Sequence, residues 1–419
     1  MKGTDLLNYF KRFQSIDAIL AAALYLGLDQ NNHTLSLGLL ISWICIRCAQ
    51  QIWKDRNDID WRRKGLFPII IFGITTFQAR TVIQLDDNPG GSIYVLIAAS
   101  LYVGSCYAIS QKMLLTRWVS AAALAINTQI LIEGIRNNNI FNPGWITEIN
   151  NEVFELGFGR INSLASVIAY FTILGFYGFR TDKSPFARLV HGITVITGYF
   201  LCLQSKSDMA IGMPIIAATV AFLICKKDYF KNIRPSKINF ISIFIISAIS
   251  SILAWTLSLR NKISPIAQNG NYWKGGEEVR IEQWVCWLKH SIFAGNNKII
   301  HGIGYNIDQM VELCNNNNPD GGLALFISQH GLLGALSLIL LAIFLIKNVL
   351  HMRKHERNSN FPSNLFACQW SEATIGTIVV VLTCNLITPS YVGSFFNASV
   401  IGIILSLGIE LAPSQETKS

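Results

Sequence analysis

The polar stretch from Arg260 to Gly321 interrupts an otherwise apolar chain, and it ends where Gly322-Leu-Ala-Leu-Phe-Ile-Ser-Gln-His-Gly-Leu-Leu-Gly334 begins. On either side of it, the chain consists of apolar runs of about 20 residues, long enough to cross the hydrocarbon core of a bilayer as helices. The stretch therefore divides the chain into three parts. We expect membrane helices over residues 1–259, one large loop over residues 260–321 and further membrane helices over residues 322–419.

The composition is that of a polytopic membrane protein. Of the 419 residues, 51% are hydrophobic and 14% are charged, whereas about 25% are charged in a soluble domain. The first apolar run follows basic residues as in a signal peptide but lacks a small-residue cleavage site, so we expect it to be retained. The sequence predicts an all-α fold of about 12 transmembrane helices, centred near residues 22, 42, 74, 100, 124, 170, 195, 217, 248, 334, 380 and 401.

The basic residues gather in alternate loops. With the N-terminus in the cytoplasm, 24 of the 34 lysines and arginines fall on the cytoplasmic side, where such loops are retained. We therefore expect both termini to be cytoplasmic and the loop between helices 9 and 10 to be extracytoplasmic. The net charge of +9 follows from this topology, and no nucleic-acid partner is expected. Cys286 and Cys314 share the large loop and could form a disulfide if that loop is extracytoplasmic. Their spacing alone does not decide it, and we expect two separate thiols.

The loop contains three motifs in order. The first is a predicted helix over residues 280–292, whose apolar stripe should lie on the membrane surface, where tryptophan is favoured. Arg280 lies beside that stripe, where a guanidinium suits a lipid diphosphate or anchors the helix to anionic lipid. The second is the turn His301-Gly302-Ile303-Gly304, whose glycines allow close backbone approach. The third is Asp320-Gly321, just before the apolar tenth helix.

This order resembles the O-antigen ligase and polymerase superfamily of bacterial envelopes. The shared pattern is Arg280-x-x-x-Trp284, a Gly-x-Gly turn, a short polar entry and a Gly331-Leu-Leu-Gly334 ending. The resemblance implies that Arg280 engages the diphosphate of an undecaprenyl-pyrophosphate-linked glycan. It also implies a role for Ser205-Lys206-Ser207, because the family has Ser-Arg-Gly or a close variant there. Lys206 keeps the charge and loses the guanidinium fork; a surface lysine paired with Asp208 is the alternative.

The chain departs from the family ligases at Asp320. Those ligases carry a His-Asn pair eleven residues before the first glycine of the Gly-Leu-Leu-Gly ending, where this chain has Asp320 and Gly321. A carboxylate can orient a sugar hydroxyl or accept its proton, and polar or acidic residues here resemble the polymerase members. The alternative role for Asp320 is an N-cap of the tenth helix. His301 is either a second acid or base, or an ordinary loop histidine.

Two further arginines stand at predicted outer helix ends. Arg80 and Arg160 are candidates for an anionic cavity, or they snorkel to the interface. Gln329 and His330 lie inside the tenth helix, where we expect them to pack between helices. The predicted catalytic residues are thus Arg280, Asp320 and His301. The predicted substrate-binding residues are Lys206, Ser205, Arg80, Arg160, Trp284, Gly302 and Gly304.

These residues predict a glycosyltransferase of the bacterial cytoplasmic (inner) membrane that needs no metal and no cofactor. Arginine and lysine can stabilise the charge that develops on a diphosphate leaving group. We favour a polymerase of O-antigen or exopolysaccharide, with a ligase that transfers the glycan to lipid A core or another acceptor as the alternative. A transporter or flippase is the second alternative. The expected partners are the undecaprenyl-pyrophosphate-linked glycan, membrane lipid and a chain-length regulator protein.

Overall fold

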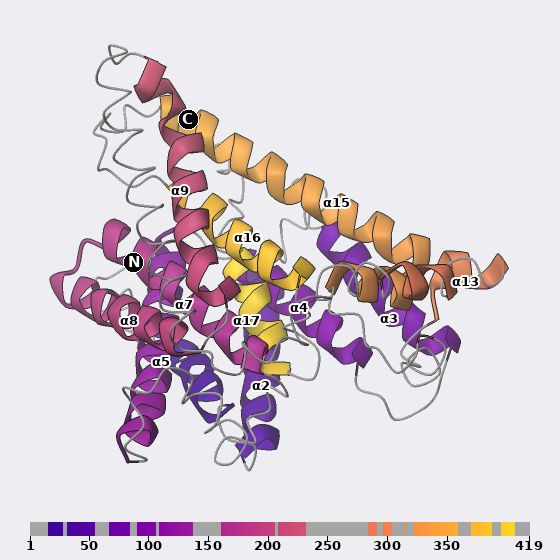
Figure 1. Cartoon of the computed structure of the whole chain (residues 1–419), viewed down its shortest axis with the longest axis horizontal. Helices are drawn as coiled ribbons and strands as arrows, with labels where there is room; N and C mark the ends of the chain where they lie inside the picture. The colour runs from indigo at the N-terminus through magenta and orange to yellow at the C-terminus, as the bar shows by residue number, and fades with distance from the viewer. Residues whose placement is uncertain are drawn as a thin grey trace, which may run out of the picture.

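Every element in the described part of the chain is a helix (Figure 1). The computed structural model describes residues 16–27, 32–54, 67–83, 90–105, 109–136, 161–205, 208–231, 284–290, 296–303, 314, 322–358, 370–387 and 395–406. The main helices are α2 (His33–Lys54), α3 (Phe67–Ile83), α4 (Gly90–Ser105), α5 (Ile109–Arg136), α7 (Ile161–Thr181), α8 (Pro185–Gln204), α9 (Asp208–Lys231), α13 (Asn296–His301), α15 (Gly322–Asn358), α16 (Trp370–Ile387) and α17 (Phe395–Ser406).

Four of the described helices are long and apolar enough to cross a membrane. They cover Lys112–Arg136, Leu164–Thr181, Pro185–Gln204 and Leu323–Lys354, and six shorter apolar helices accompany them. This arrangement is consistent with a helical membrane protein. A described helix lies at eleven of the twelve expected centres, and the ninth centre, near residue 248, lies outside the described residues. The number of crossings and the large loop as a whole remain predictions.

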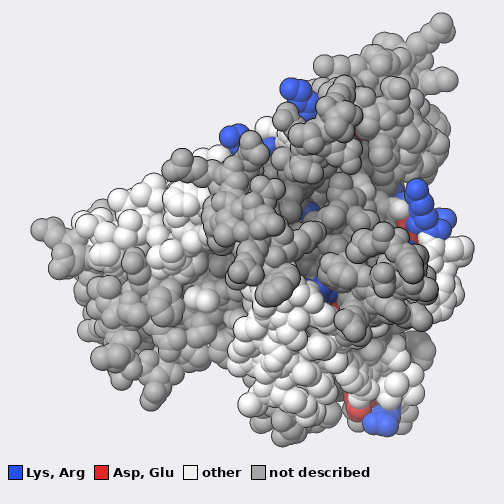
Figure 2. Space-filling view, turned by 180° about the vertical axis from the view of Figure 1, so that it is seen from behind, with Lys and Arg blue, Asp and Glu red and all other residues white. Residues whose placement is uncertain are grey.

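The core is built around α7. Its residues Leu164 to Leu174 are almost all buried, and α7 packs against α5, α8, α9, α16 and α17. A second group joins α3, α4 and α17 to α15, the long helix that runs obliquely along one side of the molecule (Figure 1). Seen from behind, the described surface is mostly uncharged, with Lys and Arg in a few small groups (Figure 2). A mostly uncharged outer surface suits helices that face lipid.

α15 is two helices joined at a break rather than one continuous helix. Gly331 has φ 60° and ψ −154°, which no helical residue adopts. The first part covers residues 322–330 and the second covers residues 332–358. The long apolar run after Gly331 predicts one membrane helix here, and a single glycine after Ser328-Gln329-His330 does not signal the break.

Candidate functional site

The structure places four of the ten predicted site residues in full. Trp284 opens the helix of residues 284–290, His301 ends α13, Gly302 follows it, and Ser205 ends α8. Arg80 lies within α3, where only its backbone is described. The other five, Arg280, Asp320, Lys206, Arg160 and Gly304, lie outside the described residues. Whether Arg280, Lys206 and Asp320 share a cavity is therefore still a prediction.

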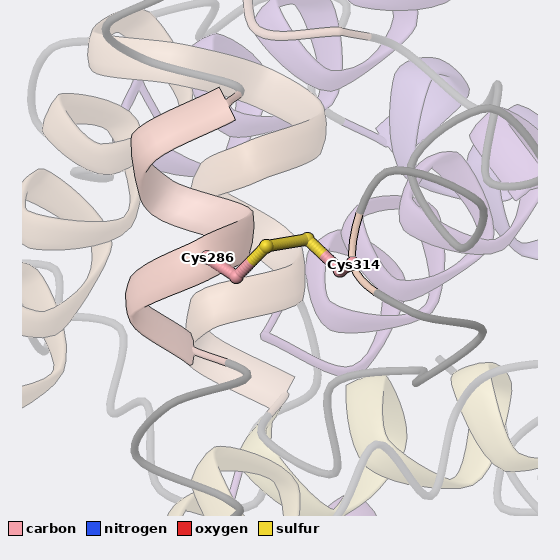
Figure 3. Close-up of a disulfide and its surroundings, with 2 residues drawn as sticks. All are labelled: Cys286 and Cys314. Carbon is pink, nitrogen blue, oxygen red and sulfur yellow. A yellow bond between two sulfur atoms is a disulfide. The ribbon is translucent and has the colours of Figure 1, made fainter.

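Cys286 and Cys314 form a disulfide, and the expectation of two separate thiols is wrong (Figure 3). Their Cα atoms lie 6.0 Å apart, within the range that a disulfide requires. The bond joins the helix of residues 284–290 to a chain segment 28 residues further on. Spacing could not reveal the pair, because a loop of this length can close in many ways.

Trp287 anchors a small apolar core beside this disulfide. Its side chain is fully buried and packs with Ile303, Cys314 and Leu325. Tryptophan in the predicted helix over residues 280–292 is expected at the membrane surface, but Trp287 faces the protein instead. Val285, on the other side of the helix, is 58% exposed. The small core fixes the helix, the turn after α13 and the start of α15 as one unit.

The backbone at Gly302, just after α13, passes very close to the backbone at Gly331, within α15. Gly302 has φ 73°, and a Cβ there would lie 2.5 Å from the carbonyl oxygen of Ser328. A Cβ on Gly331 would lie 2.7 Å from the carbonyl oxygen of Ile300. Next to the crossing, the Ile303 N–H donates to the Ser328 carbonyl over 2.9 Å. The expected close backbone approach at Gly302 is confirmed, and its partner is the break in α15.

A polar and aromatic cluster lies just before the break. The Tyr94 hydroxyl donates to Gln329 Oε1 over 3.3 Å, and the His330 ring meets Tyr94 edge-on at 4.7 Å between centroids. Gln329 and His330 are buried, as the expectation of a packing role requires. Tyr94 and Phe326 also line an apolar pocket of about 100 Å³ between α3, α4, α15, α16 and α17.

The structure shows the immediate surroundings of two predicted site residues, Ser205 and Trp284. The Ser205 hydroxyl donates to the Cys202 carbonyl over 2.7 Å and helps to cap α8. The indole Nε1 of Trp284 is buried and meets no hydrogen-bond acceptor in the described part of the chain. A buried donor of this kind is available to an oxygen of a bound molecule. His290, at the end of the same helix, is a second loop histidine that the motifs did not single out.

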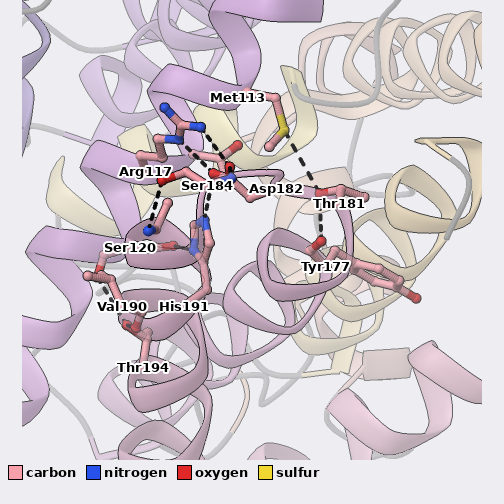
Figure 4. Close-up of polar contacts among 12 residues, drawn as sticks. Met113, Arg117, Ser120, Tyr177, Thr181, Asp182, Ser184, Val190, His191 and Thr194 are labelled. Carbon is pink, nitrogen blue, oxygen red and sulfur yellow. Dashed lines mark hydrogen bonds and ion pairs between the residues drawn. The ribbon is translucent and has the colours of Figure 1, made fainter. Parts of the chain in front are cut away.

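A separate polar cluster lies at the turn between α7 and α8 (Figure 4). Asp182 accepts from Arg117 Nε and Nη2, each over 2.6 Å, and from the Ser184 N–H over 2.9 Å. Asp182 Oδ2 lies 3.5 Å from His191 Nε2, and His191 Nδ1 lies 2.9 Å from Ser120 Oγ. Burial opposes ionisation of Asp182, but these hydrogen bonds and the neighbouring charges outweigh it and lower the pKa of the carboxyl group.

This cluster joins helices rather than acting on a substrate. A serine, a histidine and an aspartate in line are the residue types of a hydrolytic triad, but Asp182 and His191 are 0% exposed and Ser120 is buried. No substrate could reach the hydroxyl. The contacts instead tie α5 to α8 and to the turn before it, where a buried charge must be paired.

Other buried charges are also paired. Arg47 Nη2 donates to Asp17 Oδ1 over 2.5 Å, and Trp43 Nε1 donates to the same oxygen over 3.1 Å. Arg180 pairs with Glu372, and the Ser371 N–H donates to Glu356 Oε1 over 3.1 Å. The charged residues of these contacts lie at helix ends that the distribution of basic residues assigns to the cytoplasmic side. No sequence motif singles out these contacts, because pairing across helices leaves no local pattern.

No protein-family model matches the chain, and no curated protein is significantly similar to it. The resemblance to the O-antigen ligase and polymerase superfamily therefore rests on the motifs alone.

Proposed function

We propose that this protein is a polytopic membrane glycosyltransferase that uses an undecaprenyl-pyrophosphate-linked glycan as donor on the outer face of the cytoplasmic membrane. Polymerisation of O-antigen or exopolysaccharide is the favoured activity. Ligation to lipid A core or another acceptor is the alternative, and the departure at Asp320 is what favours polymerisation.

One observation carries the proposal: the loop motifs that the resemblance singles out pack on one another. Trp284 belongs to the helix that the disulfide and Trp287 hold against Leu325 of α15, and Gly302 crosses α15 at Gly331. These motifs are separated by up to about 50 residues in the sequence, so no local pattern requires them to meet. Their convergence supports a shared site at the start of α15.

The disulfide also supports an extracytoplasmic loop. Disulfides persist in oxidising compartments and are rare in the reducing cytoplasm. The paired charges described above lie on segments assigned to the opposite side of the membrane.

In the proposed reaction, Arg280 and Lys206 hold the diphosphate of the donor, and the buried indole N–H of Trp284 offers a further donor. Asp320 or His301 orients the acceptor hydroxyl and accepts its proton. The acceptor oxygen bonds to the anomeric carbon while the bond from that carbon to the phosphate oxygen breaks. The lipid diphosphate leaves with its negative charge stabilised by the two cations.

The proposal is tested with Arg280→Ala and a matched control, Lys289→Ala. Both positions carry a cation in the same loop, and Lys289 is exposed on the helix of residues 284–290. We expect Arg280→Ala to lose about 100-fold or more of the transfer rate, as removal of one transition-state donor does elsewhere, and Lys289→Ala to keep it. Normal glycan length distribution in cells carrying only Arg280→Ala would refute the proposed role.

Deletion of the protein separates the two activities: capped single repeats indicate a polymerase, and unattached long chains indicate a ligase.

The break in α15 favours a second candidate function, a transporter or flippase. Broken helices whose ends meet near a binding site are common in transporters. The side on which lipid-linked repeats accumulate after deletion separates the two functions. Accumulation outside supports the polymerase, and accumulation inside supports the flippase.

A further inference from the structure

We propose that the Cys286–Cys314 disulfide is a positioning element of the site, and that an extracytoplasmic disulfide donor must oxidise the loop before the enzyme is fully active. The positioning role rests on the proposed function, whereas formation of the bond does not.

The two half-cystines are placed symmetrically with respect to the predicted catalytic residues. Arg280 lies six residues before Cys286, and Asp320 lies six residues after Cys314. Without the bond, 40 residues of chain join Arg280 to Asp320. With it, each residue is connected to the cross-link by an arm of six residues, which reaches at most about 20 Å when fully extended.

The cross-linked ends of the two arms, at Cys286 and Cys314, are held against α15. Trp287, next to Cys286, packs with Cys314, Ile303 and Leu325. The turn after α13 has a separate attachment, because Ile303 bonds to Ser328 and Gly302 crosses Gly331. Reduction should therefore release the Cys314 arm and leave α13 docked. The expected effect is on the geometry of the site, with little effect on the helical bundle.

Formation of the bond is a two-electron oxidation. The thiols of Cys286 and Cys314 lose two protons and two electrons, and the disulfide of the donor is reduced to two thiols. Cys314 is 5% exposed, whereas Cys286 is half-buried. Cys286 is thus the sulfur that an exchange protein can reach.

The test uses the full-length protein in lipid vesicles with a lipid-linked repeat as substrate. The wild type is assayed oxidised, reduced with dithiothreitol, and reduced then cross-linked with dibromobimane, which bridges two neighbouring thiols. We expect reduction to lower kcat/KM at least tenfold, mainly through KM for the donor, and cross-linking to restore most of it. The variant Cys286→Ser/Cys314→Ser should start low and not respond to either reagent. The control Cys45→Ser, at an exposed free cysteine, should behave as wild type.

Three results overturn the inference. One is a reduced enzyme whose kcat/KM stays within twofold of the oxidised enzyme. Another is a loss on reduction that cross-linking does not reverse, accompanied by a large fall in thermal unfolding temperature. The third is a finding by differential alkylation and mass spectrometry that both cysteines are free thiols in native membranes.

Failure of the proposed function gives a different pattern. If neither the wild type nor Arg280→Ala transfers glycan while the alkylation experiment finds the disulfide, the glycosyltransferase assignment fails and the cross-link stands. The positioning role then fails with it, and limited proteolysis decides only whether the cross-link holds the chain locally. It does so if reduction opens the segment after Cys314 to cleavage before α13, and it does not if the two open together.

Discussion

Two glycines make the contact between the loop and α15 possible. Gly302 and Gly331 both have positive φ, a conformation that disfavours any side chain with a Cβ. Each also has a main-chain carbonyl oxygen within 2.7 Å of where a Cβ would stand. The backbone would have to move to admit even a methyl group.

We expect Gly302→Ala and Gly331→Ala each to destabilise the folded protein by about 1–3 kcal/mol, with a corresponding loss of activity. Thermal unfolding in detergent micelles measures the effect. Gly38→Ala is the control, because nothing lies within 4 Å of a Cβ at Gly38 in α2, and alanine is a better helix former than glycine. Equal unfolding temperatures for all three variants would contradict the crossing.

Asp182 should make stability depend on pH. Because its pKa is lower in the folded protein than the ordinary value of 3.8, the ionised carboxylate is the form that folding favours. Its contribution is present above that ordinary value and is lost as pH falls through the folded pKa. Asp182→Asn should remove this dependence and lower the free energy of unfolding by about 1–3 kcal/mol at neutral pH. The ion pair with Arg117 contributes only a small part of this, because the Arg117 side chain is 40% exposed and solvent screens the pair.

The control for Asp182 is Glu133→Gln, which breaks the surface pair with Arg136. Such pairs contribute less than about 1 kcal/mol, so the unfolding temperature should barely change. If Asp182→Asn and Glu133→Gln have equal effects between pH 3 and pH 7, the contacts around Asp182 do not stabilise the bundle.

At the scale of elements, the helix of residues 284–290 depends on one side chain. Trp287→Ala would remove most of the small core around the disulfide, and large-to-small changes of buried aromatic residues cost about 3–5 kcal/mol. We expect the loop to become sensitive to limited proteolysis while the bundle stays folded. Val285→Ala, on the exposed side of the same helix, is the control. A Trp287→Ala loop as resistant as that of Val285→Ala would show that the core does not hold it.

The helices were predictable and their contacts were not. Long apolar runs predict the positions of α5, α7 and α8, whereas α5 begins at Ile109 and so includes Lys112 and Arg117, which are expected in a cytoplasmic loop. The sequence does not reveal the break at Gly331, because a single glycine within a long helical pattern is also compatible with a continuous helix. Helical periodicity cannot reveal that Ile303 and Leu325 cover Trp287. The disulfide cannot be decided from the sequence, because two cysteines 28 residues apart carry no pairing signal.

At the scale of the whole molecule, the proposed function depends on the topology. The proposed function requires Lys289 and Lys183 to lie on opposite sides of the membrane, and both are exposed. We expect Lys289→Cys to react with a membrane-impermeant maleimide in intact spheroplasts and Lys183→Cys to react only after permeabilisation. Wild-type protein gives the background from its own cysteines. The reverse pattern would place the large loop in the cytoplasm and exclude the proposed reaction.

The second part of α15 also relates the molecule to the thickness of the bilayer. Its exposed apolar side chains form one face, at Leu332, Leu336, Ile339, Leu340, Ile343, Ile346 and Leu350. At 1.5 Å per residue this face is about 27 Å long, close to the roughly 30 Å of a hydrocarbon layer. If α15 crosses the membrane, Gly331 lies at the boundary between acyl chains and headgroups, together with the loop segments attached to it. A polyprenyl chain would then remain in the hydrocarbon while its phosphates reach the loop. In a markedly thicker membrane, Gly331 and the attached loop segments would lie within the hydrocarbon layer, away from the phosphates.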